Sequence, residues 1–167
     1  DTLLTWAARH GHVSIVALLL ERGAALHSTT GGHGASALHI ACQEGHVACV
    51  AHLVGARADV NLTRDNGGTP LHASCLLGRV ECVELLLKNG GDPRLKSDNS
   101  DTPAMVAPSG PLKELLNNWD EEETDRILAD VEKRLEKQWK PPPPDPEDQP
   151  AGQAGYFLQC PMTQFQD

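Results

Sequence analysis

The sequence predicts an all-α protein built as a solenoid, in which helix pairs of similar sequence stack in one direction. A motif recurs at a fixed period, apolar residues of helical spacing follow each copy, and glycine-rich turns separate the copies. Thr69-Pro70-Leu71-His72 has a counterpart upstream at Ser36–His39 and another, at the same interval downstream, at Thr102–Met105. A weaker copy at Thr2–Thr5 precedes Ser36 by nearly the same interval. A self-similar period of about 33 residues indicates stacked supersecondary units.

The motif itself predicts the start of a short inner helix. The hydroxyl of Thr69 is suited to accept a hydrogen bond from a free backbone N–H of the first turn. Pro70 follows at the first helical position, where it has no N–H to lose. His72 is placed to bond with the backbone of a neighbouring unit, and Gly78 is expected to end the helix in the left-handed conformation.

A second, outer helix follows in each unit. Val80, Val83, Leu86 and Leu87 recur at three- and four-residue spacing, and Asn89–Pro93 then interrupts the pattern. A single unit of this kind buries too little apolar surface to fold alone. Stability therefore comes from the stacking of neighbours.

The period and the motif resemble those of the ankyrin repeat, in which a β-turn leads into two antiparallel helices. The resemblance implies a solenoid over residues 1–119, with units at 1–30, 31–63, 64–96 and 97–119 joined by short β-hairpin loops near 31–34 and 64–68. Leu3, Leu4 and Trp6 are apolar where a terminal repeat is usually polar. We therefore expect further repeats or a cap upstream in the parent protein.

Three departures from the pattern are expected to affect the structure. Arg57 stands where Gly23 and Gly90 stand in the other units, which costs roughly 1 kcal/mol if the position is left-handed. Gly55 predicts an early end to the second outer helix. The fourth unit has Met105 for the motif histidine and Ser100 for the hairpin glycine, which is typical of a closing cap.

Residues 120–140 predict a charged amphipathic helix with its acids first and its bases last. Ile127, Leu128, Val131, Leu135 and Trp139 form its apolar stripe. Two interpretations stay open: the helix packs on the last repeat or projects as a spacer, or it docks a partner or an upstream part of the same protein.

Residues 141–167 form a Pro/Gln-rich tail that is predicted to be disordered. Lys140–Pro146 fits a basic-x-x-P-x-x-P pattern that an SH3-type domain could bind. Tyr156–Leu158 is the apolar cluster of the tail, and it is either a linear motif or a segment laid back on the repeats.

Charge and composition argue against several classes of function. The net charge is −9, with −2 over residues 1–119 and −7 over residues 120–167, so we expect no binding to nucleic acid. No apolar run approaches the ~18 residues of a membrane span. Five scattered cysteines favour a reducing location, in the cytoplasm or the nucleus.

The cysteines and histidines are expected to be structural. Cys42 and Cys75 are one repeat period apart, and so are Cys49 and Cys82, which predicts equivalent packed positions in the core. The histidines likewise occupy repeated motif positions. We expect no metal site, no cofactor and no catalytic constellation, so the chain is not interpreted as an enzyme.

The resemblance also implies a binding surface, because partners of ankyrin proteins usually contact the hairpin tips and the exposed ends of the inner helices. At the helix ends these positions are Arg9, His10, Gln43, Glu44, Leu76 and Leu77. At the tips they are His33, Ala35, Asp65, Asn66, Gly68, Asp98, Asn99 and Asp101. The adjacent Leu76 and Leu77 are either anchors for a partner or contacts to the fourth unit.

The function implied is that of a non-catalytic scaffold or adaptor that binds a protein partner with an apolar and basic segment. Two alternatives remain. Ala48-Cys49-Val50 and Glu81-Cys82-Val83 resemble ankyrin proteins that carry a SOCS box, which implies the substrate-recognition part of a ubiquitin-ligase adaptor, although no such box is present. The chain could instead be a regulatory ankyrin region of a larger enzyme. Asp59-Val60-Asn61 resembles the ankyrin context modified by the asparaginyl hydroxylase of oxygen sensing, which makes Asn61 a candidate modification site. Its other interpretation is that Asn61 braces its hairpin.

Overall fold

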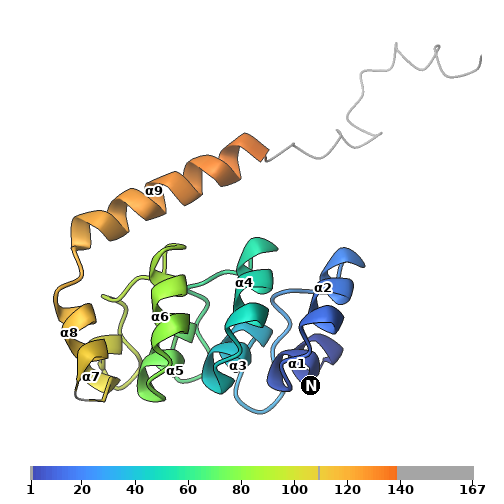
Figure 1. Cartoon of the computed structure of the whole chain (residues 1–167), viewed down its shortest axis with the longest axis horizontal. Coiled ribbons are helices and arrows are strands. Elements are labelled where there is room, and N and C mark those ends of the chain that lie inside the picture. Colours follow the sequence, from blue (N-terminus) through green and yellow to red (C-terminus); the bar gives the residue numbers. More distant parts are fainter. Residues whose placement is uncertain (1, 109, 139–167) are drawn as a thin grey trace, which may run out of the picture.

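The computed structural model describes residues 2–108 and 110–138, and it has the predicted all-α architecture (Figure 1). Within these residues four helix pairs stack side by side, and a longer ninth helix follows them. The pairs are α1 (Leu3–Arg9) with α2 (Val13–Glu21), α3 (Ala37–Glu44) with α4 (Val47–Gly55), α5 (Pro70–Leu76) with α6 (Val80–Leu87), and α7 (Pro103–Val106) with α8 (Pro111–Asn117). The ninth helix is α9 (Glu121–Gln138).

The helices of the repeats form two layers. In the inner layer α1 packs on α3, α3 on α5 and α5 on α7, and in the outer layer α2 packs on α4 and α4 on α6. Leu38, Leu53, Leu71 and Leu86 are fully buried in a continuous core formed by both layers. Each pair therefore buries its apolar faces against its neighbours, as stacked repeats require.

The repeated motif caps the inner helices and links neighbouring repeats. The Ser36 and Thr69 hydroxyls accept from the backbone N–H of His39 and His72, and each histidine Nδ1 accepts in return from the N–H of its cap residue. His39 Nε2 lies 3.1 Å from the Gly68 carbonyl oxygen, and His72 Nε2 lies 2.9 Å from that of Asp101. The expected bond from His72 to the next unit is confirmed.

Tight hairpin turns join the repeats. The Thr30 N–H donates to the Ala35 carbonyl at 2.9 Å, and the Arg64 N–H donates to the Gly68 carbonyl at 3.0 Å. Thr29 and Ser36 add an antiparallel bridge, and the described residues contain no extended strand. The hairpins contribute turns rather than a sheet.

Two residues that stand in place of a glycine have a left-handed backbone, and for Arg57 the sequence raised this conformation as a possibility. Arg57 has φ 69° and Ser100 has φ 65°, both in the left-handed region that favours glycine. The expectation for Gly55 is wrong. Helix α4 ends at Gly55, α2 ends at the equivalent Glu21, and the two helices have the same length, so the second outer helix is not shortened.

The fourth repeat is reduced. Pro103 begins a helix of only one turn, and α8 then buries Leu112 and Leu116 against the end of the core. Residues 139 and 140 of the expected charged helix, the SH3-type segment at Lys140–Pro146 and the tail at 141–167 lie outside the described residues.

Helix α9 rests on the loop that follows α6. A Cβ added at Gly90 would lie 3.3 Å from Leu128 Cδ2, 3.7 Å from Val131 Cγ2 and 3.9 Å from Ile127 Cγ2. At its first turn the Trp119 indole N–H donates to the Thr124 hydroxyl at 2.8 Å, and Thr124 is buried. Part of the predicted stripe therefore packs on the third repeat.

The expectation that the cysteines pack in the core is confirmed for four of them. Cys42, Cys49, Cys75 and Cys82 are buried as free thiols. Burial raises the pKa of Cys75 to about 12 and the pKa of Cys42 higher still. Thiols held in the protonated state are poor nucleophiles and poor metal ligands.

Candidate functional site

Two adjacent leucines stand exposed where the inner helix of the third repeat ends. Leu76 is 57% exposed and Leu77 is 48% exposed. The equivalent positions in the first two repeats hold polar residues, namely Arg9 and His10 in one and Gln43 and Glu44 in the other. The ends of the inner helices form a row, with one end from each repeat. In this row the end of the third repeat is apolar, because it carries the two leucines.

The local sequence explains why these leucines face solvent. Helix α5 turns Leu71 and Cys75 into the core, and it ends at Leu76. Leu77 is the cap residue and Gly78 follows at φ 66°, so the chain reverses direction before a further apolar position can turn inward. Neither leucine belongs to the core cluster, and contact with the fourth repeat does not bury them.

The hairpin tips form a second row, and the structure connects them to one another. The Asp65 N–H donates to the His33 carbonyl at 3.2 Å, and the Asp98 N–H donates to the Asn66 carbonyl at 3.1 Å. These four residues are exposed, as is Asn99. The backbone of each tip thus sets the position of the next.

Two tip positions are less accessible than expected. Gly68 is buried, because its carbonyl accepts from His39 of the preceding repeat. Asp101 is half-buried for the same reason, since its carbonyl accepts from His72. Gly68 therefore does not belong to the surface that a partner could contact.

The two rows lie at opposite ends of the inner helices. Each helix begins directly after a hairpin and spans about two turns, as α5 does, so the rows are separated by about 10 Å at roughly 1.5 Å per residue. A single extended or helical segment of a partner is wide enough to touch both. Arg9, His10 and Gln43 are exposed along this strip, and Glu44 and Ala35 are half-buried.

Basic residues also lie in this region, and sequence reasoning missed them. Arg79 Nε donates to the Gln43 carbonyl at 3.3 Å, and His46 Nε2 lies 3.1 Å from the Arg9 carbonyl. The available signal was the shared phase of His12, His46 and Arg79, each of which precedes an outer helix. The surface is therefore mixed in charge near Leu77.

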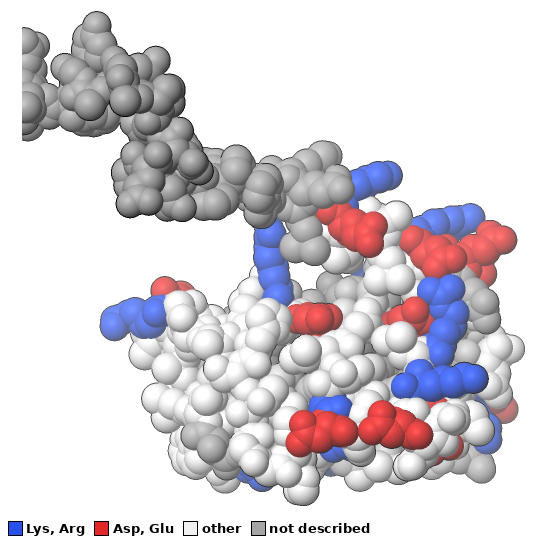
Figure 2. Space-filling view, turned by 180° about the vertical axis from the view of Figure 1, so that it is seen from behind, with Lys and Arg blue, Asp and Glu red and all other residues white. Residues whose placement is uncertain are grey.

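Charge is unevenly distributed over the molecule. Figure 2, which views the molecule from the side opposite to Figure 1, shows Asp, Glu, Lys and Arg gathered over the end formed by the third and fourth repeats and α9. The end formed by the first repeats is largely uncharged in this view. Leu76 and Leu77 belong to the third repeat and so to the more charged half of the chain.

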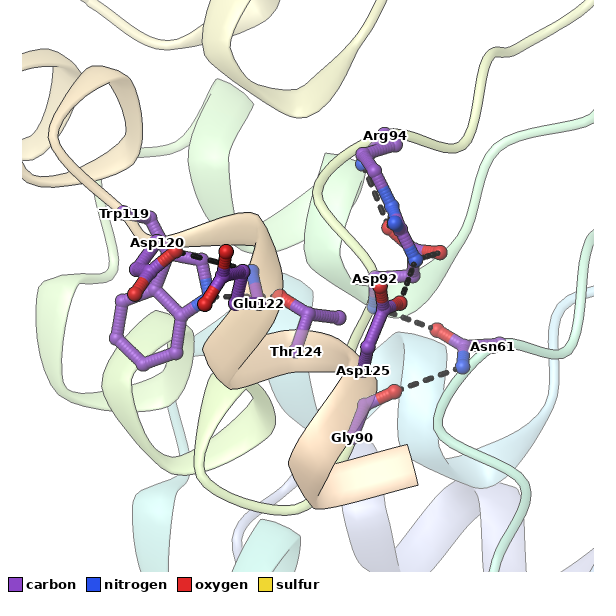
Figure 3. A network of polar contacts seen from close by, with 9 residues as sticks. All are labelled: Asn61, Gly90, Asp92, Arg94, Trp119, Asp120, Glu122, Thr124 and Asp125. Atoms are coloured by element: carbon purple, nitrogen blue, oxygen red, sulfur yellow. Dashed lines mark hydrogen bonds and ion pairs between the residues drawn. The ribbon is translucent and has the colours of Figure 1, made fainter. Parts of the chain in front are cut away.

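Asn61 is held at both ends of its side-chain amide (Figure 3). Its Nδ2 donates to the Gly90 carbonyl at 2.8 Å, and its Oδ1 accepts from the Asp92 N–H at 2.9 Å. The Asp92 carboxylate pairs with Arg94, which also contacts Asp125 of α9 at 2.9 Å. Burial raises the pKa of Asp92, but the hydrogen bonds from Arg94 outweigh it and hold that pKa below its ordinary value.

This geometry supports a bracing role for Asn61, and its hydroxylation stays a prediction. The amide joins the loop of the second repeat to that of the third, on which α9 rests.

Three further properties of the described residues concern metal sites, depressions and membrane spans. They contain no group of three or more His, Cys, Asp or Glu residues able to hold a metal ion. An open groove of about 530 Å³ lies between α2 and α4. None of the described helices is both long and apolar enough to cross a membrane.

The repeat architecture has a direct counterpart among known families. A sequence model described as "Ankyrin repeats (3 copies)" matches residues 1–64 and 38–125. The chain belongs to the ankyrin repeat family. The expected fold and family are thereby confirmed, and the capped helix pairs are ankyrin repeats.

Individual ankyrin proteins resemble parts of the chain. Ankyrin repeat domain-containing protein 29 of Homo sapiens is 41% identical over 59 residues, which is 35% of this chain and 20% of that protein. Its namesake from Danio rerio is 38% identical over 60 residues, again covering 20% of its length. The chain thus spans about a fifth of the curated relatives it matches.

A solved structure resembles more of the chain. The ankyrin repeat domain of Bcl-3, described as a unique member of the IkappaB protein family, superposes with a TM-score of 0.67 at 32% identity. The match covers 71% of this chain and 52% of that one. Ankyrin repeats are in general protein–protein interaction modules. The match to the family model and the match to the Bcl-3 domain are both consistent with that class.

Proposed function

We propose that the chain is a non-catalytic scaffold or adaptor that binds a protein partner through the inner-helix ends and hairpin tips, with Leu76 and Leu77 at the centre. The exposure of these two adjacent leucines carries the proposal. Exposed apolar residues rimmed by polar ones mark interaction sites, and a few such anchors supply most of the affinity of an interface.

The partner that fits best presents an apolar anchor with Lys or Arg nearby. Glu44 ends the inner helix of the preceding repeat, and Asp98 and Asp101 belong to the next hairpin. Charge complementarity of this kind raises the association rate and selects against acidic partners. Arg79 limits the acidic surface on the side of Gln43, so the basic residues of the partner should face the hairpin tips.

A cytoplasmic or nuclear location is part of this proposal. It is supported by the four buried free thiols, which are kept most readily in a reducing compartment.

The test is a peptide-library screen against three proteins: the wild-type chain, Leu76→Ser/Leu77→Ser, and Leu18→Ser. Leu18 is a matched control, because it is 49% exposed but lies on outer helix α2. Peptides selected by the wild type should contain an apolar residue beside Lys or Arg. Their Kd should rise about tenfold or more in the double variant, since each lost anchor costs about 1 kcal/mol.

The thermal melts of the three proteins should agree, because all the substituted side chains are exposed. If the selected peptides bound the double variant as well as the wild type, the proposed surface would be wrong. If they lacked basic residues, or if binding were insensitive to salt, the acidic rim would have no role in selection.

A further inference from the structure

The tip of the hairpin between the second and third repeats carries an asparagine followed directly by glycine, at Asn66-Gly67. Asn66 is exposed, and Gly67 has φ 69°, in the left-handed region that favours glycine. In an Asn-Gly sequence the backbone nitrogen of the glycine can attack the carbon of the asparagine side-chain amide, because glycine has no side chain to hinder the approach. The hairpin therefore presents a reactive amide at the surface.

Hydrogen bonds hold the side-chain amide of Asn66 through its oxygen. Oδ1 accepts from Arg64 Nε at 2.9 Å and from the Gly68 N–H at 3.1 Å. Two donors on the oxygen, one of them a guanidinium, stabilise the negative charge that develops there when a nucleophile attacks the amide carbon. The nitrogen Nδ2, which must leave as ammonia, has no hydrogen bond to any described residue.

A second Asn-Gly pair, Asn89-Gly90, provides an internal comparison. Here it is the leaving nitrogen that is held, because Asn89 Nδ2 donates to the Leu85 carbonyl at 2.7 Å. Gly90 is also buried, with Leu128 of α9 lying over it. The same two-residue sequence thus occurs once with a free leaving group at an exposed tip and once with a bonded leaving group under a helix.

The attacking nitrogen is bonded in both pairs. The Gly67 N–H donates to the Arg64 carbonyl at 2.8 Å, and the Gly90 N–H donates to the Leu87 carbonyl at 3.2 Å. Each bond must open before the nitrogen can attack, so both sites should react more slowly than in an unfolded chain. Local opening costs least in exposed turns, which again favours reaction at Gly67.

We propose that Asn66 is a site of deamidation in the folded protein and that Asn89 is protected. The Gly67 nitrogen loses its proton to solvent and forms a bond to the side-chain carbon of Asn66. The bond from that carbon to Nδ2 breaks, and Nδ2 takes up a proton from solvent and leaves as ammonia. Water then opens the resulting succinimide at one of its two carbonyls, which gives aspartate or isoaspartate. One water molecule is consumed for each ammonia released.

The two products change the hairpin tips in different ways. Aspartate adds a carboxylate to a tip that already carries Asp65, while the Asn66 carbonyl keeps its bond from the Asp98 N–H at 3.1 Å. Isoaspartate lengthens the backbone by one carbon and should break that bond between neighbouring tips. Aspartate should therefore strengthen binding of a basic partner and isoaspartate should weaken it, a consequence that, unlike the modification itself, rests on the proposed function.

The test compares the two sites within one sample of the full chain. The protein is incubated at mildly alkaline pH with and without urea, and the peptides that contain Asn66 and Asn89 are followed by mass spectrometry. In the folded protein the Asn66 peptide should deamidate about tenfold faster or more, since Asn89 must first lose a hydrogen bond of its leaving group. In urea the two rates should approach each other.

Variants of Arg64 test the contribution of the guanidinium. Arg64→Met, and Arg64→Lys as a second variant that keeps the charge, both remove the Nε donor. Each should slow the reaction of Asn66 several-fold in the folded protein and leave the rate in urea unchanged, and thermal melts confirm that the variants are folded.

The proposal would be overturned if Asn66 stayed intact in the folded protein over a period in which it reacts in urea. It would also be overturned if Asn89 reacted as fast as Asn66 in the folded state. Wild-type rates in both Arg64 variants would show that the guanidinium does not activate the amide. Because the mass measurement involves no partner, its result is independent of whether the proposed binding surface is correct.

Discussion

At the scale of single residues, the ring of each motif histidine caps its own helix and also bonds to the next repeat. In the neutral form Nδ1 accepts from its own helix cap, while Nε2–H donates to the carbonyl of the next repeat. A protonated ring could no longer accept at Nδ1. Burial is the main cause that lowers the pKa of His39 from 6.5 to about 4, and burial also lowers that of His72.

The first prediction concerns acid stability. Because the folded state holds His39 below its ordinary pKa, the unfolded chain binds more protons between pH 6.5 and about 4. Stability should therefore be full above pH 6.5 and decline as the pH falls through this window, by up to about 3 kcal/mol for His39 near pH 4. Urea unfolding at several pH values measures it.

The control for that prediction is His39→Gln, which should be less stable at neutral pH but should show a flatter decline with acid. His27→Gln, at an exposed position, should follow the wild type. A wild-type free energy of unfolding that stays constant between pH 7 and pH 5 would show that the buried histidines do not govern acid stability.

The second prediction concerns the strained backbone at Arg57. Because φ is 69° there, Arg57→Gly should raise the free energy of unfolding by about 1 kcal/mol, through release of the strain of a left-handed residue. Arg57→Ala should give no such gain, because alanine keeps the Cβ that causes the strain. Thermal melts of both variants separate the effect of the backbone from the loss of the arginine charge.

At the scale of elements, the loop between α6 and α7 is the link between the repeats and α9. Asn61 holds this loop from the second repeat, Gly90 provides the seat for the α9 stripe, and Arg94 connects it to Asp125. A substitution in the second repeat that weakens its contact with this loop should therefore also weaken the packing of α9 on the loop.

The third prediction tests this connection. Asn61→Ala leaves the Gly90 carbonyl and the Asp92 N–H without their partner, which should cost about 1–3 kcal/mol and increase amide hydrogen exchange in the first turns of α9. Asn66→Ala is a matched control on a hairpin tip and should leave α9 unchanged. Equal exchange in α9 for both variants would contradict the link.

The same variant serves as the control for hydroxylation. If the asparaginyl hydroxylase modifies Asn61, intact-mass measurement will show a single added oxygen in the wild type and none in Asn61→Ala. Because both polar atoms of the amide are engaged in the folded loop, modification should be faster in Asp92→Pro, which removes the N–H that holds Asn61. An equal rate would indicate that the folded loop does not protect the site.

The elements differ in how well the sequence predicts them. The bounds of the inner helices were predictable from local sequence, because Thr69 and Pro70 set the first turn and Gly78 sets the end. Gly55 led to a wrong prediction of the end of the second outer helix. A glycine indicates a helix end only at a position that needs the left-handed conformation, and here that position is Arg57. The docking of α9 was left open because its seat, Gly90, lacks a side chain and gives no sign in the sequence of what covers it.

The candidate surface was predicted in the same uneven way. Leu76 and Leu77 were expected at an exposed inner-helix end because of the resemblance to ankyrin proteins, while contact with the fourth unit was left open. The burial of Gly68 was not expected, because it depends on a histidine in the preceding repeat. Contacts between repeats lie beyond the reach of local patterns unless each position is compared with its equivalent in the neighbouring unit.

At the scale of the whole molecule, one core extends through all the repeats, but its ends differ from its middle. Leu53 is fully buried in the second repeat, with neighbours on both sides, whereas Leu112 lies in the reduced fourth repeat. The stability of a repeat array of this kind is the sum of the stabilities of its units and of the interfaces between them, and cooperative unfolding depends on intact interfaces.

The last prediction compares these positions. Leu53→Ala should cost about 2–5 kcal/mol and should lower the midpoint of the whole unfolding transition. Leu112→Ala should instead loosen the fourth repeat and α9 before the remainder. Hydrogen exchange resolved by segment measures the difference, and identical, uniform loss of protection in both variants would show that the array unfolds as a single unit.

The bonds between neighbouring repeats also determine how the molecule would respond to mechanical load. His39 reaches Gly68, Asn61 reaches Gly90 and His72 reaches Asp101, and each bond spans the same length of chain. A pull on the two ends loads these links one after another rather than together. Each rupture would release one repeat, or roughly 110 Å of contour length at about 3.3 Å per residue. The chain would therefore extend in steps of one repeat. The first step would occur at the end whose terminal repeat is less stable.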